Sequence, residues 1–378
     1  MTGCIERGRS SMGGMAIAAG LALVISACAP VTQAALYSDA PAAPNINQNT
    51  FTSFDGAQLG LSTWTPDLFS QSDMAAAGLE ETSTPLAGPS AGDCAEPCSG
   101  PPLVVIGVHG MNDYAAQFED AASWWSAHGA YVYAYDQRGF GRTPVTGVWT
   151  DPDVLREDLR TLTRLVRQRH GEQARIAVIG ASMGASVALT AFASGDPPDA
   201  DVLVLSGPGL RGWGALPWMY SVSLWLSAHV RPGWEVVPPK GVVVTPTDNR
   251  EKQIAMWKDP YVLKETRIDS VYGVVSIMEE ANDRIADLPA SVPTLFLYGA
   301  RDEIIPPGGV RRATKHMPAH VVTAYYANGY HMLLNDLQGE VVWRDILSFL
   351  RTPSGPLPSH APPIPWIDKT ADPAADGS

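Results

Sequence analysis

Charged residues are sparse in this chain of 378 residues, and basic residues are fewer than acidic ones. Lysine and arginine number 26 against 39 acidic residues, so the net charge is −13, and the basic residues form no run. Nucleic acid binding needs clustered cations that neutralise phosphates, and the composition therefore argues against a nucleic acid partner. Hydrophobic residues make up 45% of the chain, which is enough to fill a sizeable core.

The N-terminus carries an apolar run, but this run is too short to span a bilayer as an anchor. It covers residues 16–26 and follows two arginines, which is typical of a signal-peptide core. The run ends in Ile-Ser-Ala-Cys at 25–28, which resembles the bacterial lipobox, where the cysteine is lipidated and becomes the new N-terminus. Cleavage as an ordinary secretory signal near Ala27 or Ala35 is the alternative.

We therefore predict a lipoprotein signal peptide over residues 1–27 and a lipid on Cys28. Two or more acyl chains on that cysteine would hold the domain at a membrane, so a membrane is an expected partner. The predicted location is the bacterial cell envelope, with the lipid-anchored protein facing the periplasm or the exterior.

Cysteine is also scarce, with four residues in the chain. Cys4 leaves with the signal peptide and Cys28 carries the lipid, so only Cys94 and Cys98 remain. Outside the cytoplasm two nearby thiols favour a disulfide over free thiols or a metal site. No histidine or further cysteine stands near them to complete a zinc site, and we predict a Cys94–Cys98 disulfide and no metal.

The length allows one large α/β domain with an insertion, or two domains. Strand patterns alternate with helix patterns, which predicts a mostly parallel sheet covered by helices on both faces. The alternation stops after residue 206 and resumes near 294, which indicates an inserted, mainly helical cap. The predicted segments are a tether (28–48), a first core part (49–206), the cap (207–287), a second core part (288–352) and a disordered Pro-, Ala- and Asp-rich tail (353–378).

The individual elements follow from periodicity. Two apolar-alternating arms around Asp55-Gly56 predict a hairpin over residues 50–64. Unbroken apolar runs are typical of buried parallel strands, and apolar residues at helical spacing indicate amphipathic helices. The expected strands are 103–108, 131–135, 176–179, 202–205, 294–298 and 321–326, and the expected helices are 115–127, 154–170, 310–315 and 341–350, with a short one near 74–79.

The segment 176–189 contains the most informative motif of the chain, a Gly-x-Ser-x-Gly pattern. A β-branched run leads into Gly180-Ala181-Ser182-Met183-Gly184, and a small-residue apolar segment follows. This pattern predicts a strand, a sharp turn and a helix, with the Ser182 hydroxyl raised at the carboxyl edge of the sheet as a nucleophile. A serine hydroxyl needs a base, and the base needs an acid that fixes its tautomer.

The base and the acid are expected on loops after late strands, in the chain order serine, acid, histidine. Asp302 follows the strand 294–298, and His331 follows the strand 321–326, so both satisfy this order. Glu303 is the rival acid because it is adjacent to Asp302, whereas His320 precedes the last strand and lies on the wrong sheet edge. Ser186 lies one helical turn beyond the nucleophile and is expected to point elsewhere.

Two backbone N–H groups are needed to bind the oxyanion that forms on the substrate. One is expected from Met183, the residue after the nucleophile. The other is expected from Met111, because His109-Gly110 turns the chain tightly at the end of the first parallel strand.

With these residues in place, the chain resembles an α/β-hydrolase of the monoacylglycerol lipase and lysophospholipase group, which is grouped with the serine aminopeptidase-like hydrolases. The resemblance implies an α/β-hydrolase fold and a carboxylic-ester hydrolase that acts on single-chain glycerides or lysophospholipids without a cofactor. The matching motifs are His109-Gly110, 135–142 (Tyr-Asp-Gln-Arg-Gly-Phe-Gly-Arg), 180–184, 205–208 (Leu-Ser-Gly-Pro), 258–260 (Lys-Asp-Pro), 299–302 (Gly-Ala-Arg-Asp) and 329–331 (Gly-Tyr-His).

The composition of the cap indicates the class of substrate. Its first half is apolar and aromatic, and we expect Trp213, Trp218 and Trp225 to line a pocket for the acyl chain of a small lipid ester. These residues would otherwise only pack the cap onto the main domain. The second hypothesis is an aminopeptidase, in which Glu279 and Glu280 would bind the ammonium group of the substrate. The third is a non-catalytic binding protein of the cell envelope.

Overall fold

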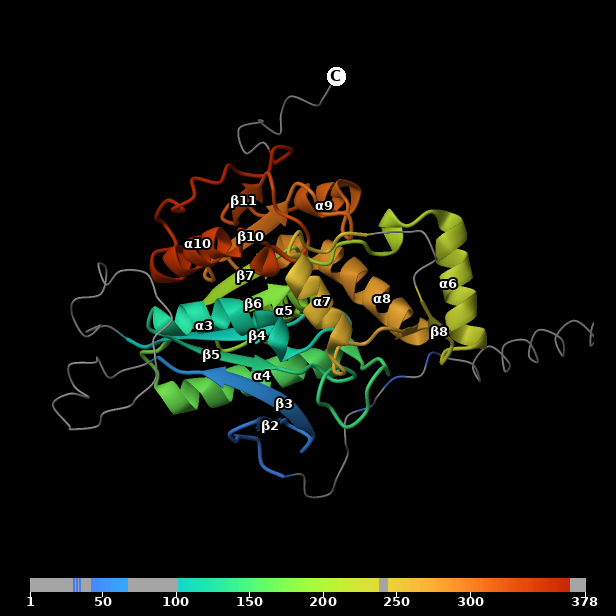
Figure 1. Ribbon diagram of the computed structural model, residues 1–378, viewed down its shortest axis with the longest axis horizontal. Helices are drawn as coiled ribbons and strands as arrows, with labels where there is room; N and C mark the ends of the chain where they lie inside the picture. Colours follow the sequence, from blue (N-terminus) through green and yellow to red (C-terminus); the bar gives the residue numbers. More distant parts are fainter. Residues whose placement is uncertain are drawn as a thin grey trace, which may run out of the picture.

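The computed structural model describes residues 30, 32, 34, 42–66, 101–237 and 244–367. A nine-stranded sheet runs through it in the order β1-β2-β3-β5-β4-β6-β7-β10-β11 (Figure 1), and β8 and β9 form a separate two-stranded sheet. The strands are β1 (Asn45–Ile46), β2 (Thr50–Thr52), β3 (Gln58–Trp64), β4 (Leu103–Val108), β5 (Ala130–Tyr135), β6 (Arg175–Ala181), β7 (Val202–Ser206), β8 (Glu235–Val236), β9 (Thr266–Arg267), β10 (Thr294–Gly299) and β11 (Val322–Tyr326).

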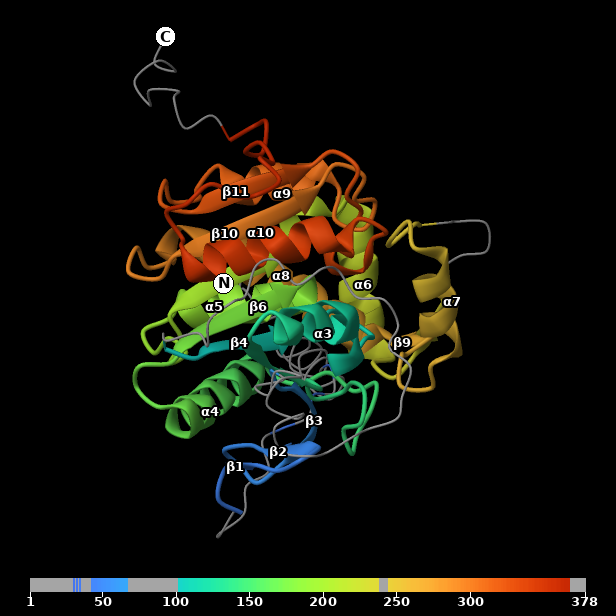
Figure 2. The ribbon, with the colours of Figure 1, turned by 60° about the vertical axis from the view of Figure 1, so that its left-hand side comes forward.

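Strands β4 to β7, β10 and β11 of the large sheet pair in parallel, whereas β1, β2 and β3 pair antiparallel at one end. The turned view shows β1 and β2 at one end of the sheet and β11 at the other (Figure 2). Parallel pairing places the carboxyl ends of β6, β10 and β11 at one edge. The predicted mostly parallel sheet and the predicted hairpin, which turns at Asp55-Gly56, are confirmed.

Helices cover both faces of the sheet and bury two hydrophobic clusters. Side chains alternate along each strand, so that Val104, Ile106 and Val108 of β4 join one cluster and Val105 joins the other. The helices are α3 (Glu119–Ala127), α4 (Pro152–His170), α5 (Met183–Phe192), α6 (Trp218–Val230), α7 (Arg250–Lys258), α8 (Ile268–Arg284), α9 (Pro307–Thr314) and α10 (Gly339–Arg351), with short 3-10 turns η1 (Ala115–Phe118), η2 (Trp213–Ala215), η3 (Ile285–Asp287) and η4 (Leu333–Asn335).

The N-terminal hairpin is fastened to the core by one buried arginine. Arg138, which follows β5, lies 2.7 Å from a carboxylate oxygen of Asp55 in the hairpin and 2.7 Å from one of Asp158 in α4. All three side chains are at most 5% exposed, so the two carboxylates and the guanidinium satisfy one another away from water. The hairpin therefore adds to the same domain as the parallel strands.

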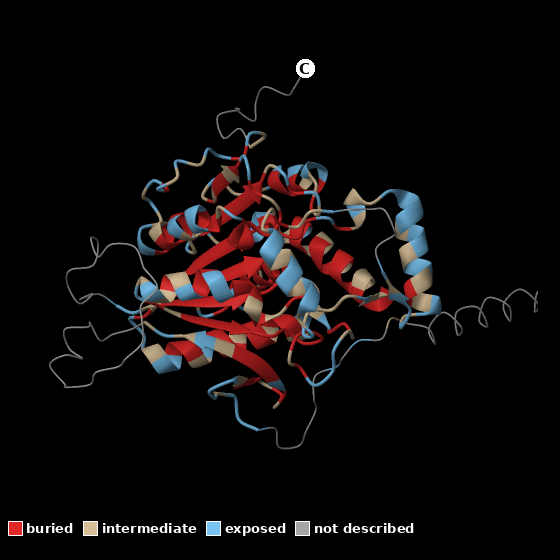
Figure 3. Ribbon diagram, viewed as in Figure 1, coloured by how far each residue is buried: buried red, intermediate tan, exposed pale blue. Residues whose placement is uncertain are grey.

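The inserted segment 207–287 contains two structurally different parts. Its last helix, α8, packs on α5 and buries Ile277 and Ala281 completely, so it belongs to the core as much as to the cap. Its helix α6 has Ala228 as its one buried residue and stands largely exposed (Figure 3). The apolar side chains of α6 include Trp218, which is 74% exposed.

The predicted disorder of the tail is wrong for residues 353–367, here called the C-terminal strap. Ile364 is 1% exposed, and the ring of Trp366 packs against Tyr298 and Tyr325. The Tyr325 N–H donates to the Pro362 carbonyl oxygen over 2.8 Å. The apolar side chains scattered among the prolines of the strap bury against β10 and β11, which the overall composition did not reveal.

Several predicted features lie outside the described residues: the signal peptide, Cys28, the pair Cys94 and Cys98, and the short helix near 74–79. Within the described part of the chain, no helix has both the length and the apolar character needed to cross a membrane.

Candidate active site

The turn between β6 and α5 holds Ser182 in a backbone conformation that side chains rarely adopt. Its φ is 51° and its ψ is −118°, which is strained for a residue other than glycine. The flanking glycines make this turn feasible. A Cβ at Gly180 would lie 2.5 Å from the Ala185 Cα, and one at Gly184 would lie 2.0 Å from the Val108 carbonyl oxygen. The sharp turn predicted from the sequence is thus enforced by contact between backbones.

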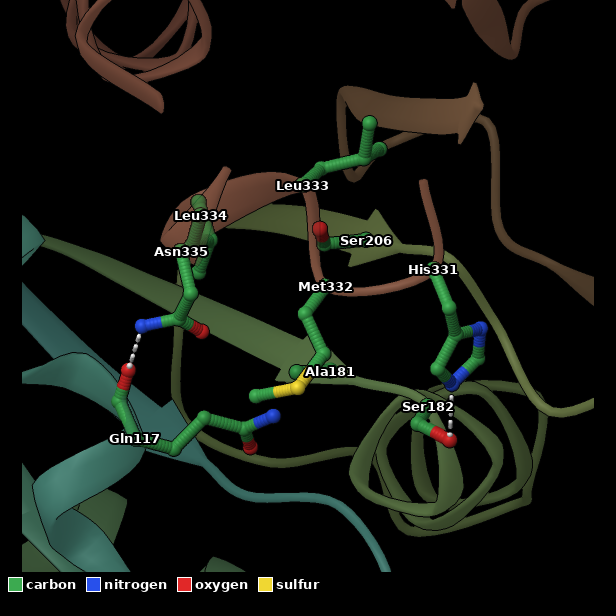
Figure 4. Close-up of a pocket in the computed structure, with 9 residues that line it drawn as sticks. All are labelled: Gln117, Ala181, Ser182, Ser206, His331, Met332, Leu333, Leu334 and Asn335. Carbon is green, nitrogen blue, oxygen red and sulfur yellow. Dashed lines mark hydrogen bonds between the residues drawn. The ribbon is translucent and has the colours of Figure 1, made fainter. Parts of the chain in front are cut away.

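Ser182, His331 and Asp302 are joined by two hydrogen bonds. The His331 Nε2 lies 2.8 Å from the Ser182 Oγ (Figure 4), and its Nδ1 lies 2.8 Å from the Asp302 Oδ2. Because the ionised carboxylate only accepts, the imidazole donates from Nδ1 and leaves Nε2 to accept from the serine hydroxyl. His331 and Asp302 are 7% and 5% exposed, so water competes little for these bonds.

The second oxygen of Asp302 is also fixed. Its Oδ1 accepts from the N–H groups of Ile304 and Ile305, over 2.9 Å and 2.8 Å. The rival acid Glu303 points elsewhere and accepts from the Thr245 N–H over 3.0 Å. The structure thus brings Asp302, rather than its neighbour, to the histidine.

The other side chains set aside at sequence level also lie elsewhere. The Ser186 hydroxyl donates to the Gly209 carbonyl oxygen over 2.6 Å and is completely buried. His320 stands before β11, at the opposite end of that strand from His331.

The segment after β4 presents a backbone N–H beside the nucleophile. A Cβ at Gly110 would lie 3.1 Å from that of Ser182, so this backbone runs close to the serine. In the peptide group between Gly110 and Met111, the Gly110 carbonyl oxygen lies 2.8 Å from the His109 Nδ1. Since the C=O and N–H of a trans peptide point in opposite directions, the Met111 N–H faces away from His109. It donates to no other residue in the described part of the chain.

The His109 ring is held as a neutral donor. Its Nε2 accepts from the Gln137 N–H over 2.8 Å, so its proton sits on Nδ1 and points at the Gly110 carbonyl oxygen. Burial lowers the pKa of His109 to about 4. The imidazole therefore stays uncharged in neutral solution and keeps the Gly110–Met111 peptide in one orientation.

The second expected N–H, that of Met183, is the first in α5. The first four N–H groups of a helix have no acceptor within it. Among the described residues, the Met183 N–H also finds no acceptor elsewhere. Met111 and Met183 are therefore both available as donors next to Ser182.

Sequence reasoning missed Gln117, a polar residue in η1. Gln117 lines a cavity of about 10 Å³ beside Ser182, together with Ser206, Met332 and Asn335 (Figure 4). A cavity of this size holds about one water molecule. No sequence signal singled out Gln117, because a glutamine in an amphipathic stretch is an ordinary surface residue.

The structure brings together two of the three cap tryptophans. Trp213 and Trp225 line an apolar groove of about 290 Å³ with Ser221, Val222 and Tyr272. The prediction that Trp218 shares this pocket is wrong, because Trp218 is the first residue of α6, lies one turn before the groove and is exposed.

The acidic residues considered for an ammonium site are already paired. Glu279 accepts from Arg312 over 2.7 Å and from the Gly214 N–H over 3.0 Å. Glu280 lies 3.0 Å from Arg156 and 2.9 Å from Arg284. These ion pairs link α8 to α9 and to α4, so the two carboxylates are not free to bind a substrate ammonium. In the described residues, no group of three or more metal-ligating side chains gathers.

Asp113 near the site gives a prediction for the pH dependence of stability. It is 5% exposed, and burial raises its pKa to about 6 despite the Tyr114 N–H, Lys252 and Lys264. A raised folded-state pKa means that the carboxyl stabilises the fold when protonated, and that this contribution is lost as the pH rises from about 4 through 6.

Asp113→Asn should therefore raise the free energy of unfolding at pH 8 by up to about 3 kcal/mol, a shift of two pKa units. The gain should nearly vanish at about pH 3, which lies below the pKa of Asp113 in both the folded and the unfolded state. Urea unfolding at the two pH values measures it, and an equal gain at both would contradict the assignment.

The strand order, the turn at Ser182 and the hydrogen-bonded serine, histidine and aspartate together define an α/β-hydrolase. The family model for serine aminopeptidase, S33, matches residues 100–338, and the chain belongs to this family. It is a serine hydrolase, as the resemblance predicted.

Known relatives agree with this assignment. The chain is 27% identical to a monoacylglycerol lipase of Mycolicibacterium smegmatis over 259 residues, which cover 67% of this chain and 90% of that protein. Among solved structures, the monoacylglycerol lipase of Paleococcus ferrophilus superposes with a TM-score of 0.56 at 22% identity, over 66% of this chain and 95% of that one. A monoglyceride lipase of Saccharomyces cerevisiae superposes with a TM-score of 0.58 at 16% identity, over 87% and 100%.

Proposed function

We propose that the protein hydrolyses carboxylic esters of single-chain lipids, monoacylglycerols or lysophospholipids, through an acyl-enzyme on Ser182. The observation that carries the proposal is the pair of 2.8 Å bonds that links Asp302 to His331 and His331 to Ser182. This arrangement supplies a nucleophile, a base and a group that holds the base in its reactive tautomer.

The reaction follows from these contacts. His331 Nε2 takes the Ser182 proton as Oγ attacks the ester carbonyl carbon, and the new oxyanion accepts from the N–H groups of Met111 and Met183. The bond to the alcohol breaks as His331 returns the proton to it. Water then attacks the acyl-enzyme with His331 again as base, which releases the fatty acid and restores Ser182.

The cap supports a lipid substrate. The groove of Trp213 and Trp225 is almost wholly apolar, and each methylene buried there contributes about 0.8 kcal/mol of affinity. An acyl chain of several carbons thus gains useful binding from this groove, whereas an acetyl group does not. The pairing of Glu279 and Glu280 with arginines argues against the aminopeptidase alternative.

The test is a panel of p-nitrophenyl esters, monoacylglycerols, lysophospholipids, triacylglycerols and aminoacyl anilides. We expect kcat/KM to rise from acetyl to medium-chain esters, and single-chain lipids to exceed triacylglycerols, which are too bulky for a covered site. Trp225→Ala should flatten the chain-length preference more than it lowers acetyl-ester turnover.

Trp218→Ala is the matched control, because Trp218 lies on the same helix outside the groove. It should leave the preference for chain length of soluble esters unchanged. A wild-type enzyme that prefers acetyl esters, or one that cleaves aminoacyl anilides faster than any ester, would overturn the substrate assignment.

Membrane attachment in the bacterial envelope through a lipid on Cys28 belongs to the same proposal. It is supported by the lipobox-like sequence and by the exposed apolar side chains of α6, which suit contact with lipid. Residues 207–234, which include α6, contain no acidic residue, although the whole chain carries 39. This stretch would therefore approach an anionic lipid surface without repulsion.

A further inference from the structure

Hydrogen bonds hold the two successive peptide groups that lead to the predicted oxyanion donor, the first at both its C=O and its N–H and the second at its C=O. In the first, the His109 carbonyl oxygen accepts from the Gln137 Nε2 over 2.6 Å, and the Gly110 N–H donates to the Gln117 Oε1 over 2.7 Å. In the second, the Gly110 carbonyl oxygen accepts from His109, and the Met111 N–H remains for the substrate. Gln117 is the side chain that holds the amide immediately before the donor.

Glycine makes this external support necessary. Gly110 approaches Ser182 too closely for a larger residue without a shift in its neighbours, and glycine has the widest choice of backbone conformations. Without the Gln117 oxygen, the buried Gly110 N–H would lack its acceptor, and the segment would rotate to find another. Rotation about the Gly110 dihedral angles would turn the Met111 N–H away from the position of the oxyanion.

Gln117 is itself fixed to the loop that carries the histidine. Its backbone carbonyl oxygen accepts from the Asn335 Nδ2 over 3.1 Å, and Asn335 lies four residues after His331. Gln117 and Asn335 are 7% and 2% exposed, so both bonds are shielded from water. The donor segment and the base are therefore held in register through Gln117.

We infer that Gln117 is a positioning residue that sets the oxyanion hole by holding the Gly110 amide, an inference that rests on the proposed Ser182 chemistry. Its side chain serves the transition state more than the bound substrate, because the oxyanion exists only after attack. Its Nε2 donates to no described residue and is available to the small cavity beside Ser182.

Gln117→Met keeps the length of the side chain and removes the acceptor. We expect kcat on a medium-chain p-nitrophenyl ester to fall about 10- to 100-fold, less than for loss of a donor itself, with KM within about threefold. Inhibition by a medium-chain trifluoromethyl ketone, whose serine adduct carries the oxyanion, should weaken by the same factor as kcat/KM. A purely structural residue would not link these two losses.

Gln117→Glu keeps an acceptor for Gly110 but places a carboxylate beside the developing negative charge. Its activity relative to wild type should therefore rise as the pH falls from 8 to 5 and the new carboxylate is protonated. The ratio for Gln117→Met should stay flat. This second variant retains the bond that holds the segment, so it reports on Gln117 even when the Met variant folds poorly.

Tyr326→Phe is the control for loss of a buried hydrogen bond, since it removes a 2.8 Å bond to Asp345 that involves neither Gly110 nor Ser182, His331 or Asp302. It should keep wild-type kcat. The inference is overturned if folded Gln117→Met matches wild type, if its loss is confined to KM, or if the Gln117→Glu ratio is independent of pH. Turnover that survives in Ser182→Ala would instead reject the proposed function.

Discussion

Ser182→Ala should lower kcat for ester hydrolysis by at least about 10³-fold, because only binding and the oxyanion donors remain. The substitution removes one oxygen atom, and with it the nucleophile and the 2.8 Å bond to His331. Labelling by a fluorophosphonate should disappear as well. Steady-state kinetics with a medium-chain p-nitrophenyl ester measure the loss.

Ser186→Ala is the matched control in the same helix. It removes a completely buried hydroxyl, which bonds to the Gly209 carbonyl oxygen rather than to His331. We expect its kcat to stay within about threefold of wild type. If Ser182→Ala keeps wild-type turnover, the assignment of the nucleophile is wrong.

The second large effect concerns Gly184. A Cβ there would lie 2.0 Å from the Val108 carbonyl oxygen and 2.5 Å from that of His109, and both atoms are backbone. Gly184→Ala must therefore push the end of β4 away from α5, which displaces the segment that carries Met111. We expect a loss of at least about 3 kcal/mol of stability together with nearly all activity.

Thermal unfolding and fluorophosphonate labelling together measure this effect. Gly195→Ala is the control, since a Cβ at Gly195 meets no atom within 4 Å. Its unfolding temperature and labelling should match wild type. A Gly184→Ala protein that unfolds and labels like wild type would show that β4 and α5 are less closely packed than described.

Most of the sheet was predictable because its strands are buried on both faces. Such strands are continuous apolar runs, as at 103–108 and 176–179, and a run of this kind can be recognised without knowledge of its neighbours in the fold. Ser182 was predictable from its two glycines, and Asp302 and His331 from chain order, since parallel strands end at one edge.

The remaining features depend on contacts between distant segments. The fold brings the Gln117 side chain to the Gly110 N–H, and a glutamine or a glycine in the sequence does not by itself predict that contact. The strap was hidden because six prolines dominate residues 353–367, although Ile364 and Trp366 pack into the core. The packing of α8 on α5 was hidden because α8 lies within the inserted segment 207–287, which suggested that it belonged to the cap alone.

The C-terminal strap also determines how the sheet ends. Strand β11 pairs only with β10 among the strands of the large sheet, so its other side is an edge whose free amides can recruit a strand from another molecule. The strap occupies this side: the Tyr325 amide is taken by Pro362, and the Ile364 N–H donates to the Thr323 hydroxyl over 3.3 Å. Because proline lacks an amide hydrogen, Pro362 accepts from the edge without offering a donor in return, and the strap covers an edge that could otherwise pair with a strand of another molecule.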